Sequence, residues 1–259
     1  MPNYQAILYE LRDGVAQITL NRPDAANSLN HQLSSELLDA LIRSEENPEV
    51  RALVLTATGR FFCAGADLKS FYTQTGTLKD RISHLHVALS RIVRAPFPVI
   101  AAVNGTAAGG GMGLAFGCDL IIAAESAKFV MAYSRIGLSP DGTTTYFLPR
   151  RIGIGRALEL AYTNRSLSAR EALEWGLVNR VVPDAELAAE AHALAAGLAK
   201  GATRALAAAK RLMHTGFVET VETQIENELR SIFDLAGSDD VKEAIKAFNE
   251  KRPAVFRGR

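Results

Sequence analysis

The stretch that decides the fold runs from Asn104 to Gly113 and reads NGTAAGGGMG. It follows an apolar run at residues 98–103, which is typical of a buried strand. The residues that follow, 112–116, are apolar enough to begin a buried helix. The glycines therefore lie where a strand turns into a helix, and glycine there allows positive φ angles and close approach of a ligand. Because the first N–H groups of a helix have no internal partner, this turn is suited to holding an anion, or a carbonyl oxygen that is becoming one.

A tight turn without any ligand would also account for this stretch taken alone. The stretch lacks the third glycine of a dinucleotide-binding fingerprint and the Lys-Ser/Thr ending of a phosphate-binding loop. A second stretch, FFCAGADLK at residues 61–69, favours a functional interpretation. It too follows an apolar strand, at residues 52–56.

These two stretches together resemble the enoyl-CoA hydratase/isomerase (crotonase) superfamily. The resemblance includes IGLSPDG at residues 136–142 and ALEWGLV at residues 172–178, and it covers nearly the whole chain. Residues 129–138 are similar to the 1,2-epoxyphenylacetyl-CoA isomerase group within the superfamily. The resemblance implies an α/β fold with a ββα spiral core, and an enzyme that acts on an acyl-CoA thioester.

The order of the expected elements agrees with the α/β class, because strands alternate with helices along the chain. We expect a β-hairpin around Asp13 and Gly14. Strands are expected at residues 52–56, 99–103, 120–124 and 129–131. Helices are expected at residues 31–45, 78–94, 150–162, 184–199, 202–214, 218–235 and 239–249. Residues 70–77 are polar and carry a glycine, so we expect a mobile loop near the site.

On the resemblance we divide the chain into a ββα spiral catalytic core, residues 1–190, and a C-terminal helical trimerisation region, residues 191–259. The sequence itself indicates only amphipathic helices in the last ~70 residues. In the superfamily this region packs on neighbouring subunits, so we expect a homotrimer or a dimer of trimers. Family members also place C-terminal residues of a neighbour near the CoA, and Lys251 matches such a position. A solvated charge in the tail is the alternative for Lys251.

Composition argues against several other classes of protein. The chain has 259 residues, of which 48% are hydrophobic and 22% charged, and its net charge is +1, as in ordinary globular proteins. This balance gives no argument for nucleic acid as a partner. Cys63 and Cys118 lack disulfide or metal-site spacing, and the five histidines form no ligand cluster. We therefore expect no metal, and no cofactor apart from the coenzyme A that enters with the substrate.

A reduced, cytoplasmic setting fits the two isolated cysteines and an N-terminus without a secretory signal. Residues 95–118 carry no charge, but their prolines and glycines would break a membrane-spanning helix. We therefore expect this run to be a buried strand, turn and helix, without contact to a membrane.

The resemblance implies an oxyanion hole built from two backbone N–H groups, those of Ala66 and Gly110. Such donors hold the thioester oxygen while negative charge develops on it, and each is typically worth a few kcal/mol. Because the backbone supplies them, the neighbouring side chains need only be small. The residues expected to bind the acyl-CoA are Ala26, Ala64, Ala66, Asp67, Leu68, Gly110, Tyr133 and Lys251.

The identity of the base decides which reaction is expected. The hydratases of the family use two glutamates at the positions that match Gly113 and Tyr133, and neither residue is acidic here. Asp141 is the remaining candidate, because some isomerases of the superfamily and the 4-chlorobenzoyl-CoA dehalogenase have a catalytic aspartate at the matching position. A turn or a helix cap is the alternative, since the aspartate lies in SPDG before a run of threonines. We expect an isomerase in which Asp141 takes a proton from C2 of a 3-enoyl-CoA and returns it at C4, or a related epoxide isomerase.

His86 keeps a second reaction open. The dehalogenase has a histidine at the matching position, and Asn164, Arg165 and residues 175–178 also look like that enzyme. There the aspartate attacks an aromatic carbon and the histidine helps water to release the product. Its tryptophan partner matches Tyr133, so one part of that site differs, and a surface histidine is the alternative for His86. The sequence is also compatible with a 2-enoyl-CoA hydratase and with a catalytically silent acyl-CoA-binding module.

Overall fold

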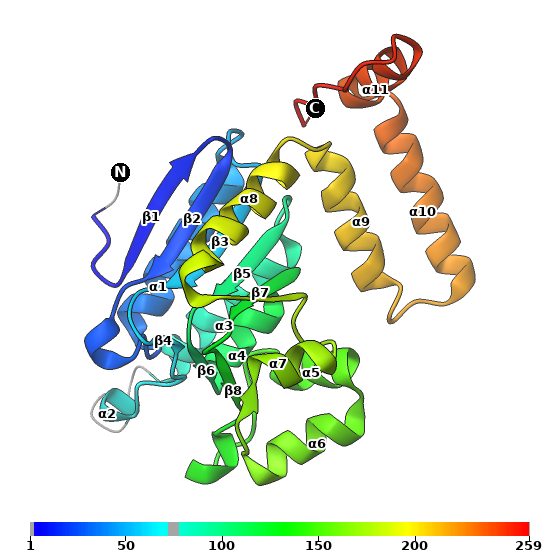
Figure 1. Cartoon of the computed structure of the whole chain (residues 1–259). Coiled ribbons are helices and arrows are strands. Elements are labelled where there is room, and N and C mark those ends of the chain that lie inside the picture. Colours follow the sequence, from blue (N-terminus) through cyan, green and yellow to red (C-terminus); the bar gives the residue numbers. More distant parts are fainter. Residues whose placement is uncertain (1–2, 72–77, 259) are drawn as a thin grey trace.

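The computed structural model describes residues 3–71 and 78–258. Its centre is a six-stranded sheet in the order β1-β2-β3-β5-β7-β10 (Figure 1). Every neighbouring pair is parallel except β1 and β2, which form the expected hairpin through Asp13 and Gly14. The strands are β1 (Ile7–Arg12), β2 (Val15–Leu20), β3 (Ala52–Ala57), β5 (Val99–Val103), β7 (Leu120–Ala124) and β10 (Arg180–Val182). All of β5 is buried, which explains why its sequence is continuously apolar and does not alternate.

A smaller sheet lies below the large one in the view of Figure 1. It has the order β4-β6-β8-β9. Its strands are β4 (Phe61–Cys63), β6 (Thr106–Ala108), β8 (Lys128–Val130) and β9 (Leu167–Ser168). Each of the first three follows directly on a strand of the large sheet, namely β3, β5 and β7, and a helix comes next in the chain. This repeat of two strands and a helix is the ββα spiral, so the expected fold class is confirmed.

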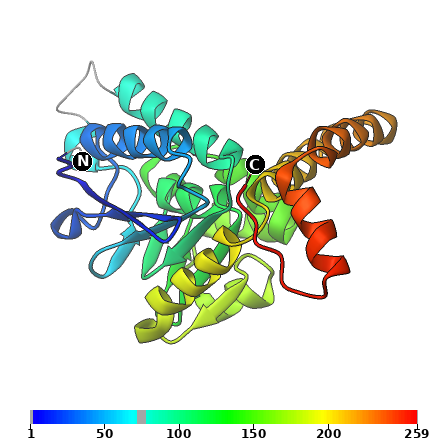
Figure 2. The ribbon, with the colours of Figure 1, turned by 90° about the horizontal axis from the view of Figure 1, so that it is seen from above.

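Helices cover both faces of the large sheet. On one side, α1 (His31–Glu46) packs against β1 and β2 and against α3 (Leu78–Arg94). On the other side, α8 (Leu187–Ala199) packs across β2, β3, β5 and β7 (Figure 2). The side chain of Asn30 caps α1 by accepting a hydrogen bond from the N–H of Leu33. The expected division of the chain at residue 190 falls inside α8, and that division stays a prediction.

The prediction of one continuous helix at residues 150–162 is wrong. The structure has two helices there, α5 (Thr144–Ile152) and α6 (Ile154–Thr163). Gly153 separates them with a φ angle of +80°, a value that does not continue a right-handed helix. A third short helix, α7 (Ala169–Glu174), begins with a capping box between Ser168 and Glu171.

The loop expected at residues 70–77 begins two residues too early. Residues 70 and 71 end a short helix, α2 (Leu68–Phe71), which follows the second glycine-containing stretch. The remainder of that expected loop, residues 72–77, lies outside the described residues.

The chain ends in three helices that project away from the sheets (Figures 1 and 2). They are α9 (Thr203–Thr215), α10 (Val221–Ala236) and α11 (Asp239–Asn249). Lys210 ties α9 to the core, because its Nζ donates hydrogen bonds to the carbonyl oxygen of Ile92 and to Oδ2 of Asp119. In the part of the chain that the structure describes, no helix is both long and apolar enough to cross a membrane.

Candidate active site

Two glycine-containing turns meet just beyond β4 and β6. Gly65 has a φ of +89°, and a Cβ on it would lie 2.9 Å from the carbonyl oxygen of Ala108 and 3.5 Å from the nitrogen of Gly110. Only glycine permits this approach of one backbone to another. The two glycine-containing stretches of the sequence are therefore in direct contact, with no side chain between them at this point.

Hydrogen bonds fix the turn that carries Ala66. The N–H of Leu29 donates to the carbonyl of Gly65 at 2.7 Å, and the N–H of Asp67 donates to the carbonyl of Leu29 at 3.1 Å. The peptide groups on both sides of Ala66 are thus held. The N–H of Ala66 itself has no hydrogen-bond acceptor among the described residues.

Gly110 presents its N–H in a different way. It is the first residue of α4 (Gly110–Gly117), so its N–H points out of the helix end and has no acceptor within the helix. The preceding Gly109 has a φ of +51°, which turns the chain from β6 into α4. Ala66 and Gly110 line the same cavity, which has a volume of about 400 Å³.

This cavity brings together most of the residues expected from the sequence. The expected residues that line it are Ala64, Ala66, Asp67, Leu68, His86, Gly110, Tyr133 and Asp141. Its other lining is largely apolar and comes from Leu29, Ile82, Leu85, Ile136 and Leu138. An apolar cavity with a few converging polar groups is the usual form of a small-molecule site.

Ala26 and Lys251 are not among the described residues that line the cavity. Ala26 supports the site from behind, because its carbonyl oxygen accepts a hydrogen bond from the N–H of Ala64. Lys251 follows α11, which lies at the far end of the projecting helices from α2 and β4 (Figure 1). Its expected role through a neighbouring subunit stays a prediction.

The carboxylate of Asp141 lies between a tyrosine and a histidine. Oη of Tyr133 donates a hydrogen bond to Oδ1 at 2.8 Å. Nε2 of His86 lies 3.5 Å from Oδ2. Burial, and next the negative charge of Asp141, raises the pKa of Tyr133 well above its usual range, so the phenol keeps the proton it donates. His86 is therefore part of the site, although its side chain is half-exposed.

The structure overturns the interpretation of Asp141 as a side-chain helix cap. No side chain caps α5, whose N-cap residue is Thr143. Instead, the backbone carbonyl of Asp141 accepts hydrogen bonds from the N–H and Oγ1 of Thr144. Because the backbone makes the turn, the carboxylate is left for Tyr133 and the cavity.

The hydrogen bond between Tyr133 and Asp141 has no signal in the sequence. Tyr133 lies in a short 3-10 helix, Tyr133–Ile136, and Asp141 lies in the turn before α5. Only the folded chain brings these two turns together. The sequence predicted that Tyr133 binds the acyl-CoA, but it predicted no partner for Asp141.

Gly113 packs against the turn that carries Asp141. A Cβ on Gly113 would lie 2.0 Å from the carbonyl oxygen of Gly142, which is far inside van der Waals contact. Gly142 has a φ of +58°, and a Cβ on it would come within 3.9 Å of Oη of Tyr133. The space in which a side chain at position 113 would begin is therefore filled by the backbone next to Asp141.

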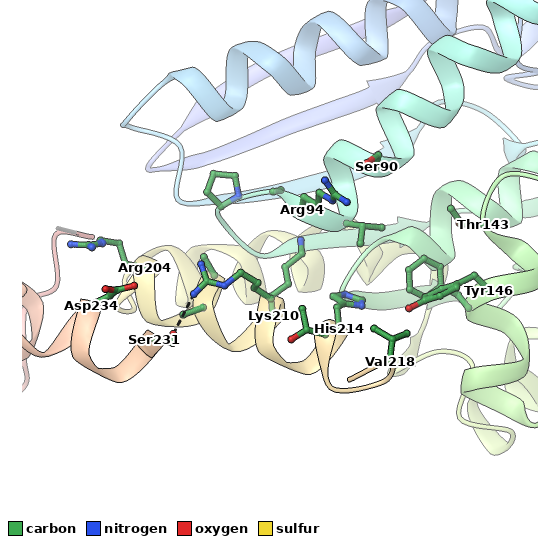
Figure 3. Close-up of a pocket in the computed structure, with 18 of the residues that line it drawn as sticks. Ser90, Arg94, Thr143, Tyr146, Arg204, Lys210, His214, Val218, Ser231 and Asp234 are labelled. Carbon is green, nitrogen blue, oxygen red and sulfur yellow. Dashed lines mark hydrogen bonds between the residues drawn. The ribbon is translucent and has the colours of Figure 1, made fainter. Parts of the chain in front are cut away.

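Figure 3 shows a second and larger cavity, which has a volume of about 920 Å³. It lies between the end of α3, the start of α5 and the helices α9 and α10, and His86 lines both cavities. Its cationic lining residues are Arg94, Arg204, Lys210 and Arg211, and His214 lines it too. Burial lowers the pKa of His214. The sequence could not reveal this cavity, because its walls come from segments more than a hundred residues apart.

The two cysteines do not fit a role as nucleophiles. Cys63 and Cys118 are both buried, and burial raises the pKa of each thiol to about 12. Residues 3–71 and 78–258 contain no group of three or more His, Cys, Asp or Glu side chains arranged to hold a metal ion.

Comparisons with known proteins identify the family of the chain and agree with its fold. A family model described as "Enoyl-CoA hydratase/isomerase" matches residues 10–259. A Rhodobacter capsulatus protein named "Probable enoyl-CoA hydratase" is 42% identical over 99% of this chain and 100% of its own length. The "1,2-epoxyphenylacetyl-CoA isomerase" of Escherichia coli is 42% identical over 98% of each chain. The "4-chlorobenzoyl coenzyme A dehalogenase-1" of Arthrobacter sp is 36% identical over 95% of this chain and 91% of its own.

Solved structures agree as well. The crystal structure of an enoyl-CoA hydratase from Bacillus anthracis matches with a TM-score of 0.94 at 36% identity, and the match covers 98% of this chain and 100% of that one. An enoyl-CoA hydratase from Polaromonas sp. JS666 matches with a TM-score of 0.92 at 34% identity, over 97% and 100% of the two chains. Relatives with differently named activities thus match nearly the whole chain.

Proposed function

The chain belongs to the enoyl-CoA hydratase/isomerase family, and from that premise we propose that it is an isomerase that moves the double bond of an acyl-CoA thioester with Asp141 as its base. The observation that carries the proposal is a single available carboxylate. Of the described residues lining the cavity of about 400 Å³, only Asp67 and Asp141 are acidic. Asp67 is paired with Arg22 at 3.1 Å, which leaves Asp141 as the base.

The proposed reaction begins with the thioester oxygen between the N–H groups of Ala66 and Gly110. Oδ2 of Asp141 removes a proton from C2 of a 3-enoyl-CoA, and the electron pair of that bond moves into the dienolate. The two N–H groups stabilise the negative charge on the oxygen as it forms. Protonated Asp141 then gives the proton to C4, and the double bond ends between C2 and C3. One carboxylate suffices, because the same proton is taken and returned.

The contacts of Asp141 suit this cycle. Tyr133 donates a hydrogen bond to Oδ1 at 2.8 Å, whereas Nε2 of His86 lies 3.5 Å from Oδ2, so Oδ2 is the less engaged oxygen and acts as the base. The hydrogen bond also fixes the orientation of the carboxyl group, which general acid–base catalysis requires. The apolar side chains that line the cavity limit the contact of a reactive intermediate with water.

The surroundings of Gly113 argue against hydration as the main reaction. A hydratase of this family is expected to carry a glutamate at this position, which would activate water together with a second glutamate. Here the carbonyl oxygen of Gly142 lies 2.0 Å from where the Cβ of such a residue would begin. The second position is Tyr133, whose hydroxyl group is a donor to Asp141.

The test is to mix the protein with a 3-enoyl-CoA and, separately, with a 2-enoyl-CoA, and to follow the ultraviolet absorbance of the conjugated thioester. A rise with the first substrate supports the isomerase. A fall with the second substrate alone would support a hydratase, and binding without any change would support a silent acyl-CoA-binding module.

The variant Asp141→Asn tests the base. It should lower turnover at least about 1,000-fold, since it removes a general base, and should leave the affinity for the acyl-CoA within about threefold. Near-normal turnover in this variant would exclude Asp141 from the mechanism.

A second function is favoured by the contact between His86 and Asp141 at 3.5 Å. In a dehalogenase-like reaction, Oδ2 of Asp141 attacks the ring carbon that carries chlorine, chloride leaves, and an aryl ester of Asp141 forms. Water, activated by His86, then hydrolyses this ester. Release of chloride from 4-chlorobenzoyl-CoA would establish this reaction, and its absence together with isomerase activity would exclude it.

We also propose that three copies assemble through the projecting helices, as the family leads one to expect. The apolar side chains exposed on α9, on α10 and between them are Met213, Phe217, Val218, Val221, Ile225, Leu229, Ile232 and Phe233. Such a surface on an isolated chain marks an interface. Sedimentation equilibrium should give three or six times the chain mass of 27.9 kDa, and a monomer would contradict the proposal.

The cytoplasmic setting of the protein stays a prediction.

A further inference from the structure

The turn that carries Ala66 is held by a partly buried ion pair between Arg22 and Asp67. Nη2 of Arg22 donates to Oδ2 of Asp67 at 3.1 Å, and Nη1 of the same guanidinium donates to the carbonyl of Ser28. The exposed fractions of the two ionic side chains are 21% for Arg22 and 14% for Asp67. Because both side chains are largely shielded from solvent, their electrostatic attraction is screened less than that of an exposed ion pair.

The two contacts of Arg22 flank the point at which Leu29 pairs with Ala66. Leu29 and Ala66 form an isolated parallel β-bridge. Ser28 precedes Leu29 on one side of that bridge, and Asp67 follows Ala66 on the other side. A single guanidinium therefore joins the two segments at the point where the oxyanion-hole N–H is presented.

Arg22 is itself fixed by the backbone around it. Its N–H donates to Oδ1 of Asn27 at 2.7 Å, and its carbonyl accepts from the N–H of Asn27 at 2.9 Å. Nδ2 of the buried Asn27 donates to the carbonyl oxygens of Thr58 and Phe61. The guanidinium is therefore attached to a rigid frame that includes the start of β4.

The charge of Arg22 also reaches the interior of the turn. Burial raises the pKa of the Cys63 thiol to about 12, and the positive charge of Arg22 acts against that rise. Cys63 is the last residue of β4, three residues before Ala66.

We propose that Arg22 and Asp67 are positioning residues that fix the direction of the Ala66 N–H in the oxyanion hole. The inference rests on the proposed function only in naming the thioester oxygen as the group that this N–H binds. The pair acts through Ala66 and does not touch the reacting atoms. Since the oxygen gains charge in the transition state, a misdirected donor lowers kcat more than it raises KM.

The experiment compares Arg22→Met, Arg22→Lys and Asp67→Asn with the parent protein. In Arg22→Met and Asp67→Asn, kcat should fall about 10- to 100-fold, less than the roughly 100- to 1,000-fold that complete loss of one oxyanion-hole donor costs, because the donor is misdirected and not removed, while KM stays within about threefold. Arg22→Lys keeps the charge but not the two-pronged geometry, so it should recover part of the loss. The matched control is Arg91→Met, which breaks a partly buried contact of 2.6 Å between α3 and Glu45 of α1, and it should leave kcat unchanged.

A second readout does not depend on turnover. The carbonyl stretch of a bound acyl-CoA labelled with ¹³C at the thioester carbon is measured by isotope-edited infrared spectroscopy. In the parent protein the stretch should move to lower frequency on binding, because two hydrogen bonds polarise the carbonyl group. In Arg22→Met and Asp67→Asn the bound carbonyl should move by roughly half as much, because one of two donors is misdirected.

The two readouts separate the possible failures. A normal carbonyl shift in all three variants, with kcat lowered only in proportion to the folded fraction, would overturn the positioning role and leave a structural one. No carbonyl shift in the parent protein would instead refute the oxyanion hole, and with it the proposed function. A shift in the parent protein without isomerase activity would refute the proposed reaction but would still test the ion pair.

Discussion

The half of the site around Ala66 and Gly110 consists of backbone, whereas the half around Asp141 consists of side chains. In the first half, a Cβ on Gly65 would lie 2.9 Å from the carbonyl oxygen of Ala108, so the two backbones leave no room for one. In the second half, Tyr133 and His86 contact Asp141 through side-chain atoms. Substitutions in the two halves of the site should therefore have different effects. A change in the first should damage the fold, and a change in the second should damage the chemistry and spare the fold.

The largest effect is expected from Gly113→Ala, which adds a methyl group where the two halves touch. Its Cβ would start 2.0 Å from the carbonyl oxygen of Gly142, so either α4 or the turn before α5 must move. We expect the free energy of unfolding to fall by about 3 kcal/mol, measured by chemical denaturation. The control is Gly155→Ala in α6, where a Cβ meets no atom within 4 Å. Equal stability of the two variants would contradict the tight contact.

The next effect is expected from Tyr133→Phe, which changes the side-chain half alone. It removes a hydrogen bond to a carboxylate, an interaction typically worth about 1.5–3 kcal/mol. We expect kcat to fall about 10- to 100-fold with KM nearly unchanged, measured by steady-state kinetics on a 3-enoyl-CoA. Tyr146→Phe is the control, since Tyr146 lines the second cavity and not the first. A Tyr133→Phe variant with full activity would show that Asp141 needs no support from the phenol.

A smaller effect is expected from His86→Gln, and it distinguishes between the two proposed reactions. Isomerisation returns its own proton through Asp141, so kcat should change by no more than about threefold. In the dehalogenase-like reaction, hydrolysis of the ester would slow strongly and the aryl-enzyme would accumulate, which mass spectrometry detects as added mass on the chain. Loss of isomerase activity in this variant would show that His86 belongs to the mechanism and does more than line the cavity.

The smallest effect lies outside both halves, in the second cavity. Burial lowers the pKa of His214 below its ordinary 6.5, while Asp119 acts in the opposite direction and Lys210 and Arg151 in the same one. As the pH falls below 6.5, the unfolded chain takes up a proton that the folded chain resists, so the free energy of unfolding should decrease. His214→Gln should remove this part of the pH dependence between pH 7 and 5, followed by urea denaturation at each pH. An unchanged slope would refute the role of His214.

Much of the first half of the site could be predicted from the sequence, because it depends on local patterns. An apolar strand followed by glycines and an apolar run predicted a strand, a turn and a helix, and the strand β5 and the helix α4 are where it placed them, but the short strand β6 (Thr106–Ala108) between them was missed. The hairpin at Asp13 and Gly14 and the helix from Leu78 to Arg94 were correct for the same reason.

The second half could be predicted only in part, because it depends on contacts between distant turns. The carboxylate of Asp141 was identified, but its hydrogen bond to Tyr133 needs the fold to bring the 3-10 helix next to the turn. The expected helix at residues 150–162 was wrong, since periodicity alone does not show that Gly153 takes a positive φ. The second cavity depends on where α9 and α10 lie, which no local pattern encodes.

The packing of Gly113 on Gly142 has a consequence for how this chain and a two-glutamate hydratase are related by mutation. An acidic side chain at position 113 has no place to begin while the carbonyl of Gly142 occupies it. No single substitution therefore leads from one active site to the other. The turn before α5 has to be rebuilt together with position 113, so the two chemistries are separated by a barrier in sequence space despite their common ancestry.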